Sequence, residues 1–253
     1  GVDGEVMHSR ESTLVLFDID GTLTKPRGHV TPEILGLLQR LRERVTVGIV
    51  GGSDLVKAKE QLGDEYPDIV DYAFAENGLV AFKDGKELSQ TSLHSHLGEE
   101  NVRRVIDWAL RYLADLDIPI KRGTFIEYRT GLINISPIGR NCNRSERDAF
   151  EAYDADHHVR RDMVAALLRD LPDLNLTCSV GGQISFDVFP TGWDKTFCLR
   201  HVEGQGFKHI YFFGDKCATG GNDHEIYQDA RVKGNAVSDP ADTERLCGEL
   251  FGV

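Results

Sequence analysis

Short, uninterrupted apolar runs that end in acidic loops constrain the fold of this chain most. Residues 13–17 (TLVLF) stop at Asp18, and residues 45–50 (VTVGIV) lead into the loop Gly-Gly-Ser-Asp at 51–54. Such runs are typical of strands buried in a parallel sheet. Between them, a Thr-Pro pair and leucines at helical spacing predict a helix over 31–41. Strand, loop and helix therefore alternate, which predicts an α/β fold with a doubly wound, mostly parallel sheet.

A different pattern occupies the middle of the chain. After an amphipathic helix predicted from Glu99 to about Leu116, apolar segments follow one another with a single predicted helix near 157–170, which indicates an inserted α+β cap domain with an antiparallel sheet. The first pattern returns after Pro190. We therefore expect a catalytic core of residues 1–86 and 190–253 and a cap domain of residues 87–189. The apolar segments of the cap are 123–129, 131–137, 174–180 and 183–189.

Charge and composition narrow the function. The chain has 253 residues with 41 acidic against 29 basic side chains, a net charge of −12, which argues against a nucleic-acid partner. Its apolar runs are too short to span a membrane and its first twelve residues lack a secretory signal, so we expect no membrane association and a cytoplasmic location. Five cysteines without a C-x-x-C pair predict free thiols.

Carboxylates gather at the predicted strand ends. Asp18 and Asp20 follow the first strand, and Asp215 and Asp223 follow a late one at 209–215. Ligands bind at this edge of an open parallel sheet, and clustered carboxylates repel unless a cation lies between them. An all-oxygen donor set favours Mg²⁺ and a phosphate substrate. Asp18 is then a candidate nucleophile and Asp20 a candidate general acid and base, although Asp-x-Asp-Gly is also a common turn sequence.

These residues resemble the haloacid dehalogenase superfamily of phosphotransferases. DIDGTLT at 18–24, Ser53, Lys195 and the pair Gly214-Asp215 with Asn222-Asp223 are similar to its four motifs. Longer stretches, among them FAENGLVAFKDGK, RGTFIEYRTGLINISPIGR and GGQISFDVFPTGWDK, resemble the eukaryotic-type phosphomannomutases from about Leu14 to Phe251.

The resemblance implies a mechanism. A hexose 1,6-bisphosphate would phosphorylate Asp18, and the phosphoenzyme would interconvert mannose 1-phosphate and mannose 6-phosphate, with Asp20 as general acid and base. Mg²⁺ would be held by Asp18, Asp215 and the backbone carbonyl of Asp20. Ser53 and Lys195 would contact the transferring phosphoryl group, and Asn222 and Asp223 would orient Lys195 and a metal-bound water. A second cation site is implied at Tyr227, Asp229 and Val232, where Val232 replaces a threonine and offers no side-chain oxygen.

A local reversal of charge marks the expected phosphate clamp. Residues 121–147 hold six basic side chains against two acidic ones. Arginine suits this role because its planar fork binds phosphate oxygens in pairs. The resemblance selects the substrate-binding residues Arg27, Arg129, Arg140, Arg147, Ser185 and Asp187, and leaves Arg122 and Arg144 as surface residues.

Two other functions remain open at this stage. A sugar-phosphate phosphatase of the same superfamily would share the aspartates and the metal and differ in admitting water, and a receiver-type switch would share the sheet but not the 100-residue insertion. The resemblance also implies a homodimer through the cap domain, a side activity on glucose phosphates and a role in supplying mannose 1-phosphate for GDP-mannose and glycosylation.

Overall fold

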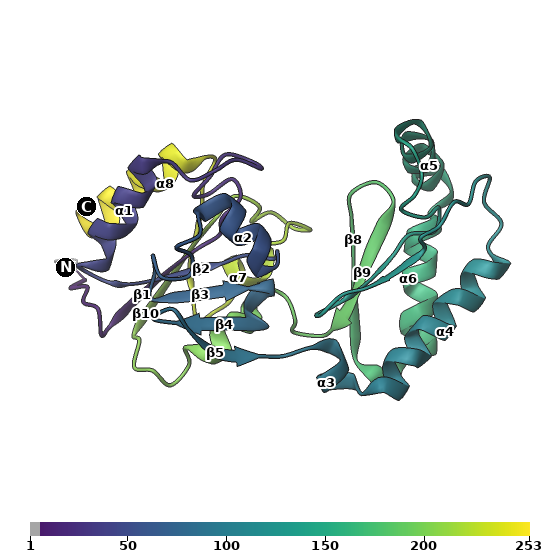
Figure 1. The fold of residues 1–253 in the computed structure, drawn as a ribbon, viewed down its shortest axis with the longest axis horizontal. Coiled ribbons are helices and arrows are strands. Elements are labelled where there is room, and N and C mark those ends of the chain that lie inside the picture. The colour runs from purple at the N-terminus through teal and green to yellow at the C-terminus, as the bar shows by residue number, and fades with distance from the viewer. Residues whose placement is uncertain (1–5) are drawn as a thin grey trace, which may run out of the picture. The chain divides into compact units, whose positions relative to one another are not determined.

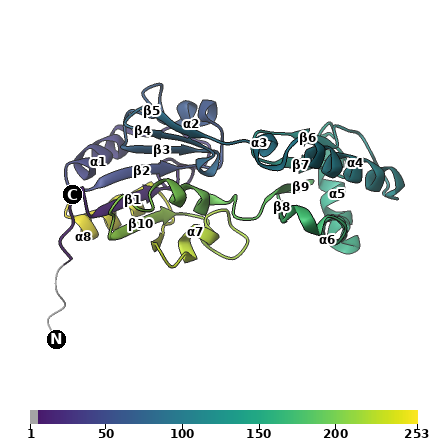
Figure 2. The same cartoon turned by 90° about the horizontal axis from the view of Figure 1, so that it is seen from below.

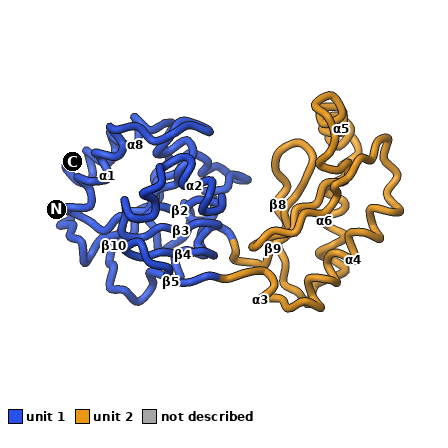
Figure 3. The backbone as a smooth tube through the Cα atoms, in the orientation of Figure 1, with its two compact units in different colours: residues 1–90, 194–253 blue, residues 91–193 orange. Residues whose placement is uncertain are grey.

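Two compact units make up the structure (Figure 3). The computed structural model describes residues 6–253. The expectation that the first twelve residues lack a secretory signal concerns in part residues 1–5, which lie outside the described residues. The core unit combines the chain through Gln90 with Asp194–Val253, and the cap unit is Thr91–Trp193. These joins lie at 90/91 and 193/194 instead of the 86/87 and 189/190 placed from sequence. The shift at the first join arises because Lys86–Gln90 forms a strand of the core sheet.

A seven-stranded sheet forms the centre of the core unit. Its strand order is β11-β10-β1-β2-β3-β4-β5, and the strands from β11 to β3 in that order run parallel. The strands are β1 (Thr13–Phe17), β2 (Thr46–Val50), β3 (Tyr72–Ala75), β4 (Val80–Lys83), β5 (Lys86–Gln90), β10 (His209–Gly214) and β11 (Lys233–Ala236).

Burial on both faces explains why β1 is apolar throughout. Val15 and Phe17 belong to the cluster that packs under α1, α2 and α8, whereas Leu14 and Leu16 belong to the cluster on the opposite face with η3 and α7. α1 and α8 lie side by side over the sheet (Figures 1 and 2). The helices of the core unit are α1 (Pro32–Arg42), α2 (Leu55–Leu62), α7 (His224–Gln228), α8 (Pro240–Phe251) and the 3₁₀ helices η1 (Glu76–Gly78) and η3 (Lys195–His201).

Two local features of the core depart from a regular alternation of parallel strands and α-helices. β4 and β5 are antiparallel, because the three-residue η1 and the Asp84-Gly85 turn are too short for the crossover that parallel strands need. The helix expected where the first pattern returns after Pro190, near 194–204, is the 3₁₀ helix η3, which begins where the carboxylate of Asp194 accepts a hydrogen bond from the backbone N–H of Thr196.

The cap unit is a four-stranded antiparallel sheet with helices on one face. The strand order is β6-β7-β9-β8, and the apolar side chains of the sheet pack against α4 and α6, which lie on the same side of the strands in Figure 1. The strands are β6 (Ile126–Tyr128), β7 (Ile133–Ile135), β8 (Leu176–Gly181) and β9 (Ser185–Pro190). The helices are α3 (Leu93–Leu97), α4 (Glu99–Asp115), α5 (Arg144–His157), α6 (Val159–Asp170) and the 3₁₀ helix η2 (Pro172–Leu174). The fold class predicted from sequence is confirmed, whereas β6 and β7 are shorter than predicted and α5 was not predicted.

Two whole-chain expectations concern thiols and membranes. All five cysteines are free. Among the helices of residues 6–253, none combines the length and the apolar character that crossing a bilayer requires.

Candidate active site

Adjacent parallel strands bring the acidic loops of the core unit together. β1 pairs with β10 along its whole length, so Asp18 after β1 and Asp215 after β10 emerge at the same edge of the sheet. The backbone N–H of Asp18 donates to the carbonyl of Phe213 at 2.9 Å and thereby continues the ladder to the nucleophile candidate. Oxygens of Asp18, Asp215 and Asp223 all lie within 4.8 Å of one another. The predicted carboxylate cluster is therefore present.

A buried lysine neutralises part of this cluster. Lys195, the first residue of η3, is 1% exposed, and its ammonium donates to Asp18 Oδ1 at 2.5 Å and to Asp223 Oδ1. The positive charge between the two carboxylates offsets the cost of burying them. Asp223 is fully buried, and its second oxygen accepts from the backbone N–H of Lys216 at 3.1 Å. Both oxygens of Asp223 accept short hydrogen bonds from protein donors, whereas Oδ2 of Asp18 accepts only a 3.5 Å bond from the hydroxyl of Thr22, so Asp18 Oδ2 and Asp215 are the carboxylate oxygens of the cluster most open to an ion.

The remaining donor set fits a hard divalent cation. The three clustered residues offer only carboxylate oxygens, as Mg²⁺ prefers. Gly21 lies against this set, because a Cβ built on it would be 2.1 Å from Asp215 Oδ2. Gly21 also has φ +79°, a conformation that other residues rarely adopt. The loop after β1 thus needs glycine for its backbone turn and for the close approach of Asp215.

Burial sets the protonation of Asp18. Burial and the neighbouring charge of Asp223 raise the pKa of Asp18 to about 7, although the ammonium of Lys195 opposes the shift. The pKa of Lys195 stays above its usual value because its two carboxylate partners outweigh burial. A cation bound next to Asp18, in addition to the ammonium of Lys195, would therefore strongly stabilise the ionised carboxylate.

Asp20 points to a different set of partners. Its Oδ1 accepts from the backbone N–H of Arg27 at 2.6 Å and from Gln61 Nε2 at 3.1 Å. The side chain is half-buried, outside the cluster of three carboxylates. An acid and base that is not a metal ligand through its carboxylate is free to exchange a proton. Gln61, which joins α2 to this loop, was not predicted from the sequence.

The loop after β2 presents Ser53. The carbonyl of Ser53 accepts from the backbone N–H of Glu76 at 2.9 Å, and the carbonyl of Gly51 accepts from that of Asn77 at 2.8 Å. η1 therefore fixes this loop from the neighbouring strand. Within residues 6–253, the hydroxyl of Ser53 and the guanidinium of Arg27 have no protein hydrogen-bond partner.

Asn222 and the residues of the predicted second cation site lie outside the cluster of three carboxylates. Asn222 is exposed in the loop before α7. Both oxygens of Asp229 accept hydrogen bonds from Arg231. Oδ1 accepts from the backbone N–H at 2.9 Å and from Nε at 2.8 Å, and Oδ2 accepts from Nη2 at 2.8 Å. Tyr227 and Val232 are half-buried. A second cation at Asp229 would have to displace this guanidinium, and the site remains a prediction.

Four of the predicted substrate residues lie on the polar face of the cap sheet or contact it, namely Arg129, Arg140, Ser185 and Asp187. Glu127, Asn134 and Asp187 are cross-strand partners on β6, β7 and β9. Glu127 accepts from Arg129 Nε at 2.7 Å and lies 3.6 Å from Arg140 Nε. The two arginines thus converge on one carboxylate, an arrangement that also suits a phosphate.

Asn134 connects this arginine pair to the other half of the predicted set. Arg140 Nη1 donates to Asn134 Oδ1 at 2.8 Å, and Asn134 Nδ2 donates to Ser185 Oγ at 3.1 Å and to Asp187 Oδ1 at 2.9 Å. Arg147, on the first turn of α5, is half-buried and its guanidinium has no partner within residues 6–253. Arg122, predicted as a surface residue, pairs with Glu146 at 2.6 Å.

Comparison with known proteins identifies the family. The sequence matches the eukaryotic phosphomannomutase family over residues 34–253. The chain belongs to this family. It is 58% identical over 242 residues to a phosphomannomutase of Glycine max, covering 96% of this chain and 97% of that one, and 55% identical over 241 residues to phosphomannomutase 1 of Dictyostelium discoideum, covering 95% and 97%.

Solved structures support the fold. A trehalose-6-phosphate phosphatase of Aspergillus fumigatus has a TM-score of 0.65 at 18% identity, covering 96% of this chain and 94% of that one. This likeness shows a haloacid dehalogenase-type fold. Membership of the phosphomannomutase family implies a metal cofactor, for which the carboxylate cluster provides ligands, and hexose phosphate substrates.

Proposed function

We propose that this chain interconverts mannose 1-phosphate and mannose 6-phosphate through a phosphorylated Asp18, primed by a hexose 1,6-bisphosphate. The observation that carries the proposal is the buried ion pair of Asp18 with Lys195, next to Asp215 at the ends of two paired strands. Family membership supports the choice of substrate.

The transfer divides among residues of the core unit. An oxygen of Asp18 attacks the phosphorus of the bisphosphate, the bond to the sugar oxygen breaks, and Asp20 gives that oxygen a proton. In the second half, Asp20 removes the proton of a sugar hydroxyl, whose oxygen takes the phosphoryl group from Asp18. Lys195 and Ser53 stabilise the charge on the phosphoryl oxygens. Mg²⁺, held by Asp18, Asp215 and the backbone carbonyl of Asp20, would neutralise the carboxylates and the phosphoryl oxygens.

The cap arginines take the phosphate that is not transferred. Arg129, Arg140 and Arg147 of the cap unit offer guanidinium forks, of which that of Arg147 has no partner in the described residues. Arg27 of the core unit is a further substrate-binding residue of the proposal, on the ground of the family resemblance alone. Ser185 and Asp187 would bind sugar hydroxyls. Binding energy at the unreactive end of a substrate supports catalysis by holding the reacting group in place.

The test replaces the nucleophile by its isosteric amide. Asp18→Asn should reduce interconversion in a coupled assay with glucose 1,6-bisphosphate by more than about 10³-fold, since an amide oxygen cannot form the acyl phosphate. Asp54→Asn is the matched control, because Asp54 caps α2 in the next loop and asparagine caps a helix equally well. Appreciable residual activity of Asp18→Asn would exclude Asp18 as the nucleophile. Steady release of phosphate from mannose 6-phosphate by the wild type, without interconversion, would establish a phosphatase instead.

The proposal extends to assembly and location. We place the enzyme in the cytoplasm, where it would supply GDP-mannose synthesis, and propose a homodimer through α4. Leu110 on this helix is 52% exposed, and Trp108 and Tyr112 line a surface hollow of about 470 Å³. Sedimentation at micromolar concentration should give the mass of a dimer, and a monomer would overturn this part.

A further inference from the structure

A buried amide lies at the centre of the cap's polar face. Asn134 is 5% exposed, on a strand between β6 and β9, and none of the predicted catalytic or binding roles includes it. It makes three side-chain hydrogen bonds, one from Arg140 and two to Ser185 and Asp187. Every one of these partners belongs to the proposed substrate-binding set.

The chemistry of the partners determines which side chain fits here. A guanidinium only donates hydrogen bonds, and an ionised carboxylate only accepts them. The residue between Arg140 and Asp187 must therefore accept on one side and donate on the other. Asparagine does both at once, whereas aspartate would place a second negative charge against Asp187 and leucine would leave both partners without a bond.

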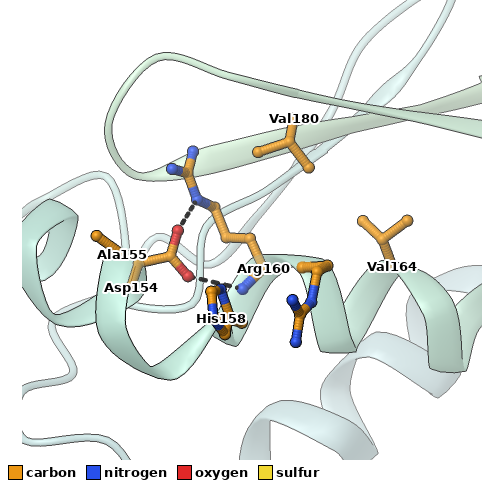
Figure 4. A pocket seen from close by; sticks show the side chains of 7 residues that line it. Asp154, Ala155, His158, Arg160, Val164 and Val180 are labelled. Carbon is orange, nitrogen blue, oxygen red and sulfur yellow. Dashed lines mark hydrogen bonds and ion pairs between the residues drawn. The ribbon is translucent and has the colours of Figure 1, made fainter.

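The backbone segments that carry the hydrogen-bond partners of Asn134 are also fixed by hydrogen bonds. Arg160 on α6 is paired with Asp154 at 2.7 Å and donates to the carbonyls of Gly181, Gly182 and Ser185, so it fastens the β8–β9 turn to the helix layer (Figure 4). On the other side, the backbone N–H of Arg140 donates to the carbonyl of Thr124 at 2.8 Å. Because the backbone near Ser185 and at Arg140 is fixed in this way, the amide of Asn134 determines the orientation of the Arg140 and Asp187 side chains.

We propose that Asn134 is a positioning residue that sets the distance between the phosphate-binding arginine, Arg140, and the hydroxyl-binding pair, Ser185 and Asp187. The inference rests on the proposed mutase function and deepens it by naming what fixes the phosphate-to-sugar spacing that the enzyme accepts. Because the amide contacts the binding residues and not the nucleophile, its loss acts on substrate affinity more than on the transfer step.

The experiment compares two replacements with a matched control. Asn134→Asp changes only the donor end of the amide, and Asn134→Leu removes both ends without adding charge. Asn101→Asp is the control, because Asn101 on α4 of the same unit also accepts from an arginine, Arg104, and donates to a carbonyl, that of Leu97. KM and kcat for mannose 1-phosphate, the melting temperature, and calorimetric binding of mannose 1-phosphate are measured for all four proteins.

Both substitutions at Asn134 should raise KM and the calorimetric Kd by about 10- to 100-fold. This is the range expected when misplaced Arg140 or Asp187 side chains lose one or two charge-assisted hydrogen bonds to the substrate. kcat should change by less than about fivefold, and Asn101→Asp should match the wild type.

A pH series provides the readout that a purely structural role would not change. The charged groups around position 134 are Glu127 from β6, Asp187 from β9 and Arg140 from the loop after β7. At low pH the carboxyl group introduced by Asn134→Asp is protonated and regains a hydrogen-bond donor toward Asp187. The ratio of its KM to that of the wild type should therefore fall between pH 8 and pH 5, while the ratio for Asn134→Leu stays constant.

The outcomes separate the inference from the function on which it rests. An inactive wild type would overturn the proposed mutase. With an active wild type, a KM within twofold of normal in both Asn134 variants, or ratios for Asn134→Asp that do not depend on pH, would overturn the role of Asn134 alone. If Asn134→Asp does not fold, Asn134→Leu alone decides through its KM and Kd.

Discussion

A single methyl group on Gly21 should uncouple metal binding from folding. In Gly21→Ala the new Cβ would lie 2.1 Å from Asp215 Oδ2 and 2.6 Å from its Cγ. Side-chain atoms do not approach a Cβ closer than about 3 Å, so the carboxylate must move by about 1 Å or rotate away from Asp18. The loop pays a second cost because the backbone at Gly21 has φ +79°.

The control isolates the backbone cost. Gly220 has φ +87° in the loop after β10, and a Cβ built there meets nothing within 4 Å. Both alanine variants should therefore lose about 1–2 kcal/mol of unfolding free energy from the strained backbone. The displacement of Asp215 occurs in Gly21→Ala alone. A displacement of about 1 Å in an active site costs on the order of 10²-fold in rate, so kcat should fall about 100-fold in Gly21→Ala and less than about threefold in Gly220→Ala.

Urea unfolding and an activity titration with Mg²⁺ measure both effects. We expect nearly equal urea midpoints for the two variants and a higher Mg²⁺ requirement for Gly21→Ala only. Equal activities in the two variants would refute the reasoning, because the steric contact with Asp215 would then have no consequence for the site.

Two further substitutions test the charged interior of the core unit. Lys195→Met should lower the unfolding free energy by about 3–5 kcal/mol, because it leaves Asp18 and Asp223 buried without a counter-charge. Mg²⁺ should restore more stability in the variant than in the wild type. A loss below about 1 kcal/mol in urea unfolding would contradict this. Asp71→Asn tests pH dependence: burial opposes ionisation, but hydrogen bonds from Arg10 and the backbone of Val47 hold the pKa of Asp71 below its usual 3.8. Its stabilisation is complete above the unfolded pKa and disappears as pH falls through the folded one, so the deficit of the variant should shrink progressively below about pH 3.8. A deficit that is the same at pH 5 and at pH 2.5 would refute the assignment.

Patterns that reflect burial were predicted well from the sequence. The run at 13–17 is apolar because both faces of β1 are covered, and that same burial places Asp18 beside Asp215. The turn between β4 and β5 lies at Asp84-Gly85, where the sequence indicates a hairpin-type turn, whereas the antiparallel pairing of β3 with β4 depends on the short connection η1 and has no signal in composition. A signal for α5 was present and overlooked, since Asn143 and Glu146 form a capping box at its start.

The site residues that sequence did not suggest share one property. Gln61 and Asn134 act through hydrogen bonds whose partners lie far away in the chain, 41 residues to Asp20 and 51 to Ser185. An amide on a helix or a short strand has no periodic or charge signature, so a single sequence does not distinguish it from any polar surface residue. Asp223 was predicted, but not that both of its oxygens accept short hydrogen bonds from protein donors, which leaves Oδ2 of Asp18 and the carboxylate of Asp215 more open to an ion.

The pairing of β1 with β10 determines when during synthesis this site comes into existence. Asp18 and Lys195 are separated by 177 residues, and the whole cap unit lies between them in the chain. A ribosome adding roughly 5–20 residues per second completes the cap before either Lys195 or β10 has emerged. Until then β1 has an open edge on the side that β10 will occupy, an arrangement that invites pairing with other chains. The last strands to be made therefore cover this edge of β1 and assemble the active site in the same event.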